Sequence, residues 1–344
     1  MRSFRLLLLV LMMAVLLASC GQTTAGPATT PTPTPALSSS ARAYLTAALD
    51  IMQRYSVNRK KINWTTLRQD AFYLAAGSQT PADTYQAIRY AVYELGDHHS
   101  FFFEPQAMQQ QAAALTPDEV PHGQRLSHGI GYLALPHFGG SEQATQQYIL
   151  LAQHAIRTAD QAGTCGWIVD LRINDGGNMW PMLAGVGPIL GEGVVGSFVI
   201  PGGAKTPWGY SHGQAQLAGS TIIGTPNAYY LKHLLPPVAV LTASNTASSG
   251  EAIVVAFRGR PQTRSFGEPT HGIPTANAPF TLRDGATLNL TTALDADRTG
   301  HTYDSAIAPD QASPVVDPSK IGTPGDPGLR AATTWLHDQE GCQG

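Results

Sequence analysis

Residues 237–257, which read PVAVLTASNTASSGEAIVVAF, form the stretch of sequence that decides the fold. The apolar run at 238–241 predicts a buried strand, and an apolar face that begins at Ile253 predicts a helix. The small polar residues between them predict a tight turn from strand to helix. This turn places Ser248 at the helix start, where unpaired backbone N–H groups and the positive end of the helix dipole favour negative charge.

Ser248 has two interpretations on this pattern alone. A hydroxyl at this position could attack a carbonyl group. A serine followed three residues later by Glu251 is also a capping box, in which the serine only caps the helix. Because capping is the commoner role for such a pattern, a nucleophile needs support from other parts of the chain.

A second turn from strand to helix is predicted at residues 170–181, which read DLRINDGGNMWP. Gly176 and Gly177 allow close backbone approach, and the turn presents N–H groups. It could supply the second donor of an oxyanion hole whose first donor is the amide of Ser249. The alternative is a glycine-rich connection without a chemical role. No Gly-Lys-Ser/Thr pattern accompanies the glycines, which argues against a phosphate loop.

A histidine pair follows a predicted helix in residues 95–103, which read LGDHHSFFF. A serine nucleophile needs a base near neutral pH, and histidine is the side chain whose ordinary pKa lies there. His98 and His99 could instead bind a metal. Neither a His-Glu-x-x-His motif nor a pair of thiolates accompanies them, so we expect no metal and no cofactor.

The order of elements predicts an α/β (α+β) fold. Residues 39–125 are expected to form a helical N-terminal domain, because apolar residues recur there at helical spacing. Residues 126–344 are expected to form an α/β catalytic core that ends in a helix. Short apolar runs at 130–135 and 167–171 flank a helical pattern, which predicts a parallel strand pair.

The N-terminal residues predict export. Residues 1–19 combine a cationic start with a short apolar run, as in a signal peptide, and Cys20 follows in a bacterial lipobox. Residues 20–38 alternate Pro and Thr and predict an extended tether. Removal of residues 1–19 takes away Arg2 and Arg5 and changes the formal charge from -3 to -5, so nothing favours nucleic acid binding.

These pieces occur together and in order, and with them the chain resembles the tail-specific (C-terminal processing) serine peptidase family. The family's histidine motif, Leu-x-Asp-x-His-Ser/Thr, matches with His99 at the histidine position. The family's nucleophile motif matches with Ser248 at the serine position. The matching blocks are residues 95–100 (LGDHHS), 129–134 (GIGYLA), 166–177 (GWIVDLRINDGG), 246–251 (TASSGE), 266–272 (FGEPTHG) and 306–310 (AIAPD).

The resemblance implies a helical region packed on a mixed-sheet core of the tail-specific peptidase or crotonase-like type. It implies Ser248 as nucleophile and His99 as base, beside the oxyanion donors named above. The sequence does not define the residue that orients His99, and the candidate acids are Asp97, Glu268 and Asp304.

Two departures from the family pattern are informative. Members with a Ser-Lys dyad carry lysine directly after the Thr-x-Gly of the block at 266–272, where this chain has Ile273, which cannot act as a base. The interval from Ser100 to Gly129 is too short for a PDZ domain. Both departures resemble the branch without a PDZ domain that includes the nisin resistance protein and the tricorn core protease.

We therefore expect a serine endopeptidase that cleaves peptides or protein C-terminal tails. It would be exported and lipid-anchored to the outer face of the bacterial cytoplasmic membrane or cell envelope. The alternative is a non-catalytic peptide- or ligand-binding module on the same fold. Because the chain retains both Ser248 and His99, we favour the enzyme.

A competing motif lies at residues 209–213 (GYSHG), which fit the Gly-x-Ser-x-Gly elbow of α/β-hydrolases. That elbow needs a buried strand before it and a long helix after it. Residues 201–208 are Gly-rich and irregular, and residues 214–220 are too short for such a helix. We therefore interpret this segment as a loop.

The two remaining cysteines, Cys165 and Cys342, are an even pair in an exported chain, so a disulfide is permitted. Cys165 precedes a predicted core strand, and Cys342 follows the terminal helix. Similar pairs flank these elements in the family, and this resemblance implies a disulfide between them. Two unpaired thiols are the alternative.

Overall fold

The computed structural model describes residues 36–105, 114–161, 163–314 and 317–343. The predicted signal peptide, the lipidation site Cys20 and the tether up to residue 35 lie outside the described residues. Ser38, which the sequence pattern assigned to the tether, is the N-cap of the first helix because its side chain accepts a hydrogen bond from the amide of Ala41. The compact unit begins at Ala36.

The N-terminal region is helical, as predicted. Its apolar residues at helical spacing, among them Tyr44 and Leu45 of the first helix, are buried in one cluster. Apolar residues from 282–290, far along the chain, complete this cluster. The elements are α1 (Ser39–Tyr55), α2 (Trp64–Leu74), the short 3-10 helix η1 (Ala82–Thr84) and α3 (Tyr85–Tyr93).

One sheet is antiparallel throughout its described strands, in the order β1-β12-β5-β6-β7-β8, with β11 and β13 also paired to β12. Its strands are β1 (Phe101–Phe103), β5 (Gly193–Val199), β6 (Lys205–Ser211), β7 (Gln214–Leu217), β8 (Ser220–Gly224), β11 (Thr275–Thr281), β12 (Thr287–Asp297) and β13 (Thr302–Tyr303).

The second sheet has the order β14-β10-β9-β4-β3-β2, and all its strands are parallel except β2. The predicted parallel pair is present as β3 and β4. The strands are β2 (His122–Arg125), β3 (Ile130–Ala134), β4 (Gly166–Asp170), β9 (Val238–Thr242), β10 (Thr263–Gly267) and β14 (Gln311–Ala312). Further short 3-10 helices are η3 (Pro117–Glu119), η4 (Ser127–Gly129) and η5 (Pro318–Lys320).

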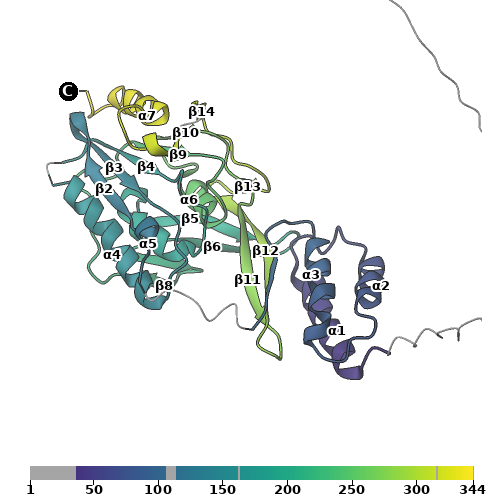
Figure 1. The fold of residues 1–344 in the computed structure, drawn as a ribbon. Coiled ribbons are helices and arrows are strands. Elements are labelled where there is room, and N and C mark those ends of the chain that lie inside the picture. Colours follow the sequence, from purple (N-terminus) through teal and green to yellow (C-terminus); the bar gives the residue numbers. More distant parts are fainter. Residues whose placement is uncertain (1–35, 106–113, 162, 315–316, 344) are drawn as a thin grey trace, which may run out of the picture. The chain divides into compact units, whose positions relative to one another are not determined.

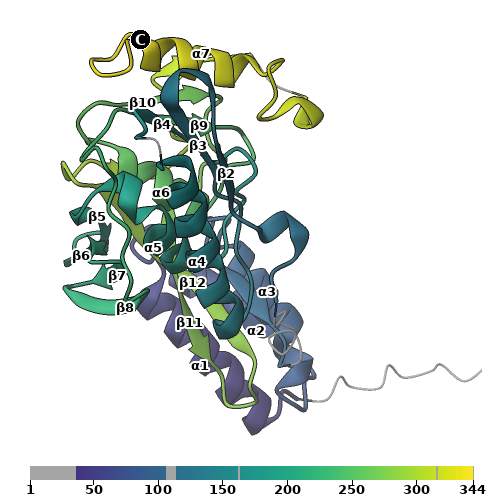
Figure 2. The same cartoon turned by 90° about the vertical axis from the view of Figure 1, so that its left-hand side faces the viewer.

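Helices cover both faces of the parallel sheet (Figures 1 and 2). On one face, α4 (Glu142–Ala159), α5 (Met179–Leu190) and α6 (Ser249–Phe257) bury side chains such as Trp167 of β4. On the other face, α7 (Pro327–His337) buries Leu329, Ala332 and Leu336 against the strands. Strands buried on both faces explain why β3, β4 and β9 are continuous apolar runs rather than alternating ones.

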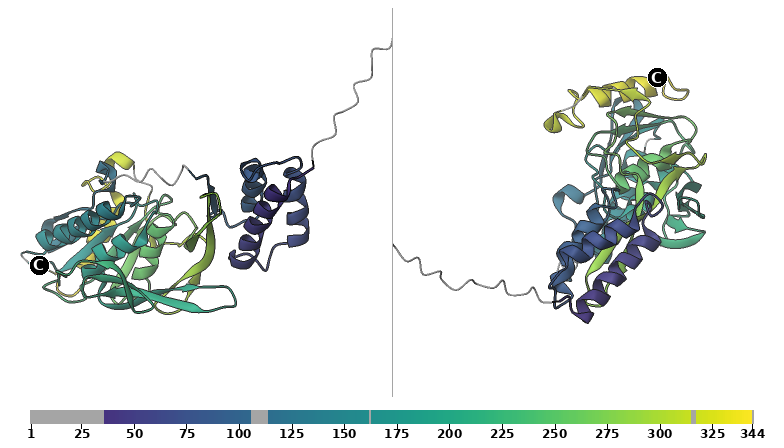
Figure 3. Two further views of the ribbon diagram at one scale, coloured as in Figure 1. Left: turned by 90° about the horizontal axis from the view of Figure 1, so that it is seen from below. Right: turned by 90° about the vertical axis from the view of Figure 1, so that its right-hand side faces the viewer.

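The β11–β12 hairpin connects the helices to the sheets, and Figure 3 shows it beside the purple and blue N-terminal helices. Asp284 at its tip accepts hydrogen bonds from the hydroxyls of Tyr44 (2.7 Å) and Tyr85 (2.6 Å). Residues 282–290 add the apolar contacts described above. This hairpin therefore fixes the helical region, and with it the loop that carries His99.

The loop expected at residues 209–213 is wrong for residues 209–211, and the expected irregular structure at residues 201–208 is wrong from Lys205 onward. Residues from Lys205 to Ser211 form β6, which turns into β7 as a tight antiparallel hairpin. Trp208, Gly209 and Tyr210 are buried in succession on this strand, whereas Lys205 and Pro207 are exposed. The Gly and Pro residues hid the strand from the sequence pattern. Ser211 ends a hairpin strand and precedes no helix, so it does not lie on a hydrolase elbow.

The disulfide expected between Cys165 and Cys342 is present. It joins the residue before β4 to the segment after α7, and the two cysteines have a sequence separation of 177. Cys342 is buried, and a Cβ on Gly166 would lie 3.3 Å from its Sγ. The bond therefore ties α7 to the sheet that it covers.

We predict that replacing both cysteines, as Cys165→Ser with Cys342→Ser, lowers the free energy of unfolding. Loop-closure entropy sets the loss at about 5 kcal/mol for so long a loop, as an upper value, because strain and unfolded-state structure reduce it. Urea unfolding of the natural protein, with and without reductant, gives the same comparison without mutation. Superimposable curves for the oxidised, reduced and mutated forms would contradict the prediction.

Candidate active site

Ser248 lies at the turn between β9 and α6, where the sequence pattern predicted it. Its backbone has φ 52° and ψ -117°, a conformation that residues other than glycine rarely adopt. Strain of this kind persists where surrounding contacts impose it, and it is concentrated at functional sites. The side chain is half-buried, and the first helical residue, Ser249, follows directly.

The Glu251 carboxylate imposes this conformation. One of its oxygens accepts hydrogen bonds from the amides of Ser248 and Ile273, both at 2.9 Å. The other accepts from the Thr270 hydroxyl (2.5 Å) and the Gly272 amide (2.8 Å). Glu251 is fully buried, so its charge depends on these four donors and on the N-terminal end of α6. The carboxylate thus holds the Ser248 turn to the segment 270–273.

Asn174 connects the Ser248 turn to the glycine turn that follows β4. Its backbone carbonyl accepts a hydrogen bond from the amide of Ala247 at 3.0 Å. Its side-chain Nδ2 donates to the carbonyl of Leu135 (2.9 Å), and its Oδ1 accepts from the amide of Gly176 (3.1 Å). A Cβ on Gly250 would come within 2.5 Å of the Asn174 carbonyl oxygen. The two turns therefore fit together without room for larger residues.

The three predicted oxyanion donors differ in availability. The Gly176 amide already donates to Asn174, so the prediction of this residue as a donor is not supported. Among the described residues, no acceptor takes the amide of Ser249 or of Gly177. A Cβ on Gly176 would lie 2.8 Å from the Cβ of Ser248, so this glycine serves the close approach of the two turns.

Gly177 is fixed by its neighbours. It forms a parallel bridge with Phe138, in which the Phe138 amide donates to Gly176 and the Asn178 amide donates to Phe138. Its φ is +101°, and a Cβ would lie 1.9 Å from the Phe138 carbonyl oxygen, so only glycine fits. Its carbonyl accepts from the hydroxyl of Ser249 at 2.6 Å. Gly177 and Ser249 therefore hold each other beside Ser248.

His99 is buried and is held at its backbone and at its ring, whereas His98 is exposed. The amide of His99 donates to the carboxylate of Asp97 (2.9 Å), and the carbonyl of His99 accepts from the side chain of Asn277 (2.7 Å). Its ring Nδ1 is 2.7 Å from the hydroxyl oxygen of Thr275. Burial lowers the pKa of His99 to about 4, with nearby His271 adding to this effect and Asp97 opposing it. The imidazole is therefore neutral, as a general base must be.

None of the three predicted orienting acids is hydrogen-bonded to the imidazole. The Asp97 carboxylate accepts from the Ser100 amide and hydroxyl and from the hydroxyl of Thr291, so it shapes the loop instead. The backbone of Glu268 exchanges hydrogen bonds with Thr242, and the exposed Asp304 has Ser305 as its hydrogen-bond partner among the described residues. Thr275 was not among the predicted site residues, although it begins the strand directly after the matched block at 266–272.

Among the described residues, no hydrogen bond joins Ser248 to His99. They are connected through one segment instead, because residues 270–273 bond to Glu251 and Thr275 bonds to His99. Hydrogen bonds between catalytic groups are often long in unliganded proteins and shorten when substrate binds. Within the described ranges, no group of three His, Cys, Asp or Glu side chains is arranged to bind a metal.

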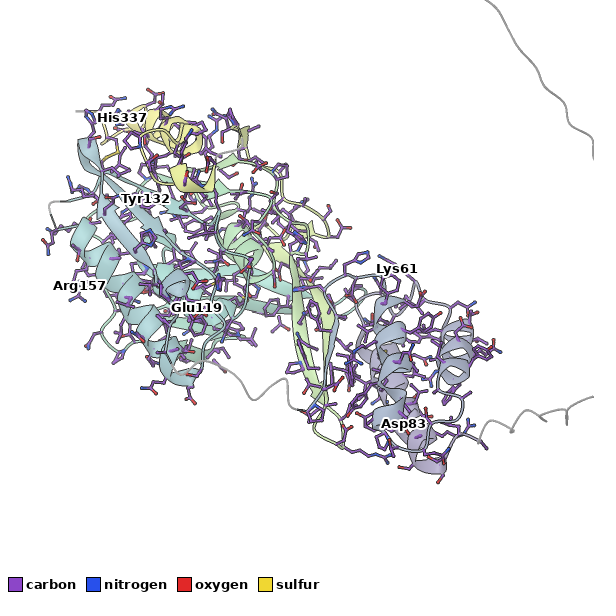
Figure 4. All side chains as sticks on the ribbon, viewed as in Figure 1. Lys61, Asp83, Glu119, Tyr132, Arg157 and His337 are labelled. Carbon is purple, nitrogen blue, oxygen red and sulfur yellow. A yellow bond between two sulfur atoms is a disulfide. The ribbon has the colours of Figure 1, made fainter. Side chains whose placement is uncertain are left out.

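A buried ionic cluster lies between the end of β4 and the glycine turn. Arg172 bonds to the carboxylates of Asp170, at the end of β4, and Asp326, the N-cap of α7. The hydroxyl of Tyr132, labelled in Figure 4, also donates to Asp170 at 2.8 Å. A buried cation of this kind needs both acids, since losing either would leave uncompensated charge. The Asp-Leu-Arg motif is thus structural.

Asp295 is a buried acid next to this machinery. It lies on β12 and is 1% exposed, and neither of its carboxyl oxygens has a hydrogen-bond partner among the described residues. Burial, together with the charge of Glu251, raises its pKa to about 7. Its backbone amide donates to the carbonyl of Pro274, so it adjoins the segment that carries Thr275. The protonated form is the one this environment favours.

Comparisons with known proteins agree with this fold. The profile of Peptidase family S41 matches residues 129–313, more than half of the 344 residues. The nisin-resistance protein of Lactococcus lactis subsp. lactis is 27% identical over 270 residues, which cover 78% of this chain and 81% of that protein.

Two solved structures are similar along nearly their whole length. A lipoprotein from Streptococcus agalactiae superposes with a TM-score of 0.68 at 25% identity, covering 87% of this chain and 97% of that one. The photosystem II D1 C-terminal processing protease gives 0.58 at 16% identity, covering 86% and 98%, which shows the shared fold.

The fold and the family match define the class of protein as a serine peptidase. The chain belongs to peptidase family S41, and the resemblance read from its sequence motifs is confirmed.

We predict that Asp295→Asn makes the protein more stable than the natural form at pH 8 but not at pH 4. The raised pKa means that the folded state holds the proton more tightly than the unfolded state. The stability that this gives is complete below pH 3.8, decreases as the pH rises and is lost above about pH 7. The difference corresponds to roughly 4 kcal/mol at most.

Urea unfolding at pH 4, 6 and 8 measures this effect, with Asp304→Asn as the control because Asp304 is exposed. The unfolding free energy of Asp295→Asn minus that of the natural protein should increase from pH 4 to pH 8, whereas the same difference for the control should stay constant. A difference for Asp295→Asn that does not change with pH would contradict the raised pKa.

Proposed function

We propose that the protein is a serine endopeptidase of the cell envelope in which Ser248 is the nucleophile and His99 is the general base. The observation that carries this proposal is the position of Ser248 at the strained start of α6, beside the amides of Ser249 and Gly177, which donate to no acceptor among the described residues. A strained turn next to unused donors is the arrangement that acyl transfer requires.

The proposed chemistry proceeds in two halves. Ser248 Oγ attacks the scissile carbonyl carbon while Nε2 of His99 takes the hydroxyl proton, and the amides of Ser249 and Gly177 stabilise the oxyanion. The imidazolium then gives this proton to the leaving amine, which leaves an acyl ester on Ser248. A water molecule, deprotonated by the same nitrogen, hydrolyses the ester and restores the hydroxyl.

The environment of His99 supports its role as base. Its pKa of about 4 keeps the ring unprotonated at neutral and mildly acidic pH. The same burial disfavours the imidazolium, so the proton should pass rapidly to the leaving amine. His98 is exposed and has a positive φ of 56°, which fits a turn residue that presents its neighbour.

We propose peptides or protein C-terminal tails as substrates. This is supported by the similarity to proteins described as C-terminal processing proteases and as a nisin-resistance protein. The envelope location is supported by the N-terminal sequence pattern, the disulfide and the likeness to a lipoprotein. In the part of the chain that the structure describes, no helix is long and apolar enough to cross a membrane. We propose lipid on Cys20 as the anchor, because this cysteine follows the signal pattern in a bacterial lipobox.

We predict that Ser248→Ala abolishes both peptide cleavage and labelling by a serine-directed phosphonate, and that Ser211→Ala changes neither. His99→Ala should lower kcat/KM by about 100-fold or more. His98→Ala should keep most of the activity, because its ring is exposed to solvent. Labelling is followed by intact-mass spectrometry, and cleavage is followed on a fluorogenic peptide.

Labelling that persists in Ser248→Ala would overturn the nucleophile assignment. Equal losses in the two histidine variants would overturn the choice of His99. A protein that binds peptides, is not labelled and does not cleave them would be the non-catalytic module.

We predict that the mature protein is membrane-bound through Cys20 and that Cys20→Ala releases an active, soluble form. Cell fractionation with an activity assay on each fraction measures this. Association of the Cys20→Ala protein with membranes after a high-salt wash would contradict lipid anchoring as the cause.

A further inference from the structure

Among the described residues, the hydrogen-bond partner of the His99 ring is a hydroxyl and not a carboxylate. Nδ1 lies 2.7 Å from Oγ1 of Thr275, which begins β11 and is half-buried. The ring also meets Phe101 edge to face, with centroids 6.1 Å apart. Together these contacts fix both the position and the plane of the imidazole.

The backbone near Thr275 offers its hydroxyl a second acceptor. The carbonyl of Ile273 accepts from the Thr275 amide at 2.8 Å and lies 3.5 Å from the Thr275 hydroxyl oxygen. When the hydroxyl proton is directed to that carbonyl, Oγ1 presents a lone pair to Nδ1. The ring then carries its proton on Nδ1 and leaves Nε2 unprotonated, which is the tautomer a general base needs.

The same segment also holds the nucleophile. The Ile273 amide and the Ser248 amide share one oxygen of Glu251, each at 2.9 Å. A continuous path of hydrogen bonds therefore runs from Ser248 through Glu251 and Ile273 to Thr275 and the imidazole. A displacement of Thr275 would change the alignment of the base relative to a nucleophile that remains fixed.

We propose that Thr275 is the positioning residue of the dyad. Its hydroxyl oxygen selects the Nδ1–H tautomer of His99 and points Nε2 at the substrate, in the place where other serine peptidases use a carboxylate. This inference rests on the proposed role of His99 as base. It assigns the orienting group to a neutral side chain that lies 176 residues from the histidine in sequence.

The test compares Thr275→Val, which removes the hydroxyl and keeps the shape, with Thr275→Ser, which keeps the hydroxyl. Thr281→Val is the matched control, since Thr281 is exposed at the far end of the same strand. We expect Thr275→Val to lower kcat by about 10- to 100-fold at unchanged KM, Thr275→Ser to recover most of the loss, and the control to stay within about twofold.

A second readout does not depend on activity or on the folding of a variant. Nitrogen-15 NMR of the histidine-labelled, full-length natural protein at pH 7 distinguishes a protonated Nδ1 from a protonated Nε2. We expect the His99 resonances to report Nδ1–H, and a mixture of the two tautomers in Thr275→Val. A purely structural threonine would not shift this equilibrium.

The outcomes separate this inference from the function it rests on. If His99→Ala remains active, the proposed function is wrong whatever Thr275 does. If His99→Ala is inactive while Thr275→Val keeps its kcat, or if the natural protein carries its proton on Nε2, the positioning role alone is overturned.

Discussion

The arrangement of the site depends on one buried carboxylate, that of Glu251. Burying an isolated charge is very costly unless donors surround it, and here two donors occupy each oxygen. Glu251 also lies in the first turn of α6, where the helix dipole favours an anion. The donors come from the Ser248 turn and from residues 270–273, so satisfying this charge holds two distant segments in a single geometry.

The proposed base, His99, comes from a separate part of the chain. His99 follows the N-terminal helices, and these are held in place by the β11–β12 hairpin through Asp284 and the apolar residues around it. The base of the same hairpin carries Thr275 and Asn277, which hold the ring and the carbonyl of His99. One hairpin thus sets both where the helical region lies and how His99 is oriented, so the proposed dyad depends on the N-terminal helices.

Local patterns made part of this structure predictable. Two turns could be predicted because their contacts are close in sequence. One is marked by a serine three residues before a glutamate at a helix start, and the other by paired glycines after an apolar strand. The family motifs added His99. The hydrogen-bond partner of the His99 ring could not be predicted from the sequence, because the pairing of β11 with β12 is what brings Thr275 to the ring. The use of the Gly176 amide by Asn174 was likewise hidden, since a sequence shows that an amide exists but not its acceptor.

A neutral orienting group is consistent with the charges already present. The Glu251 carboxylate lies beside the turn that carries Ser248, and Asp295, buried next to it, has its pKa raised to about 7. A third carboxylate at position 275 would add a like charge to this low-dielectric region, and each added charge would weaken the others. The proposed threonine hydroxyl would orient the imidazole without this cost. The pKa of His99 stays at about 4, because among the described residues no carboxylate is hydrogen-bonded to the ring to offset its burial.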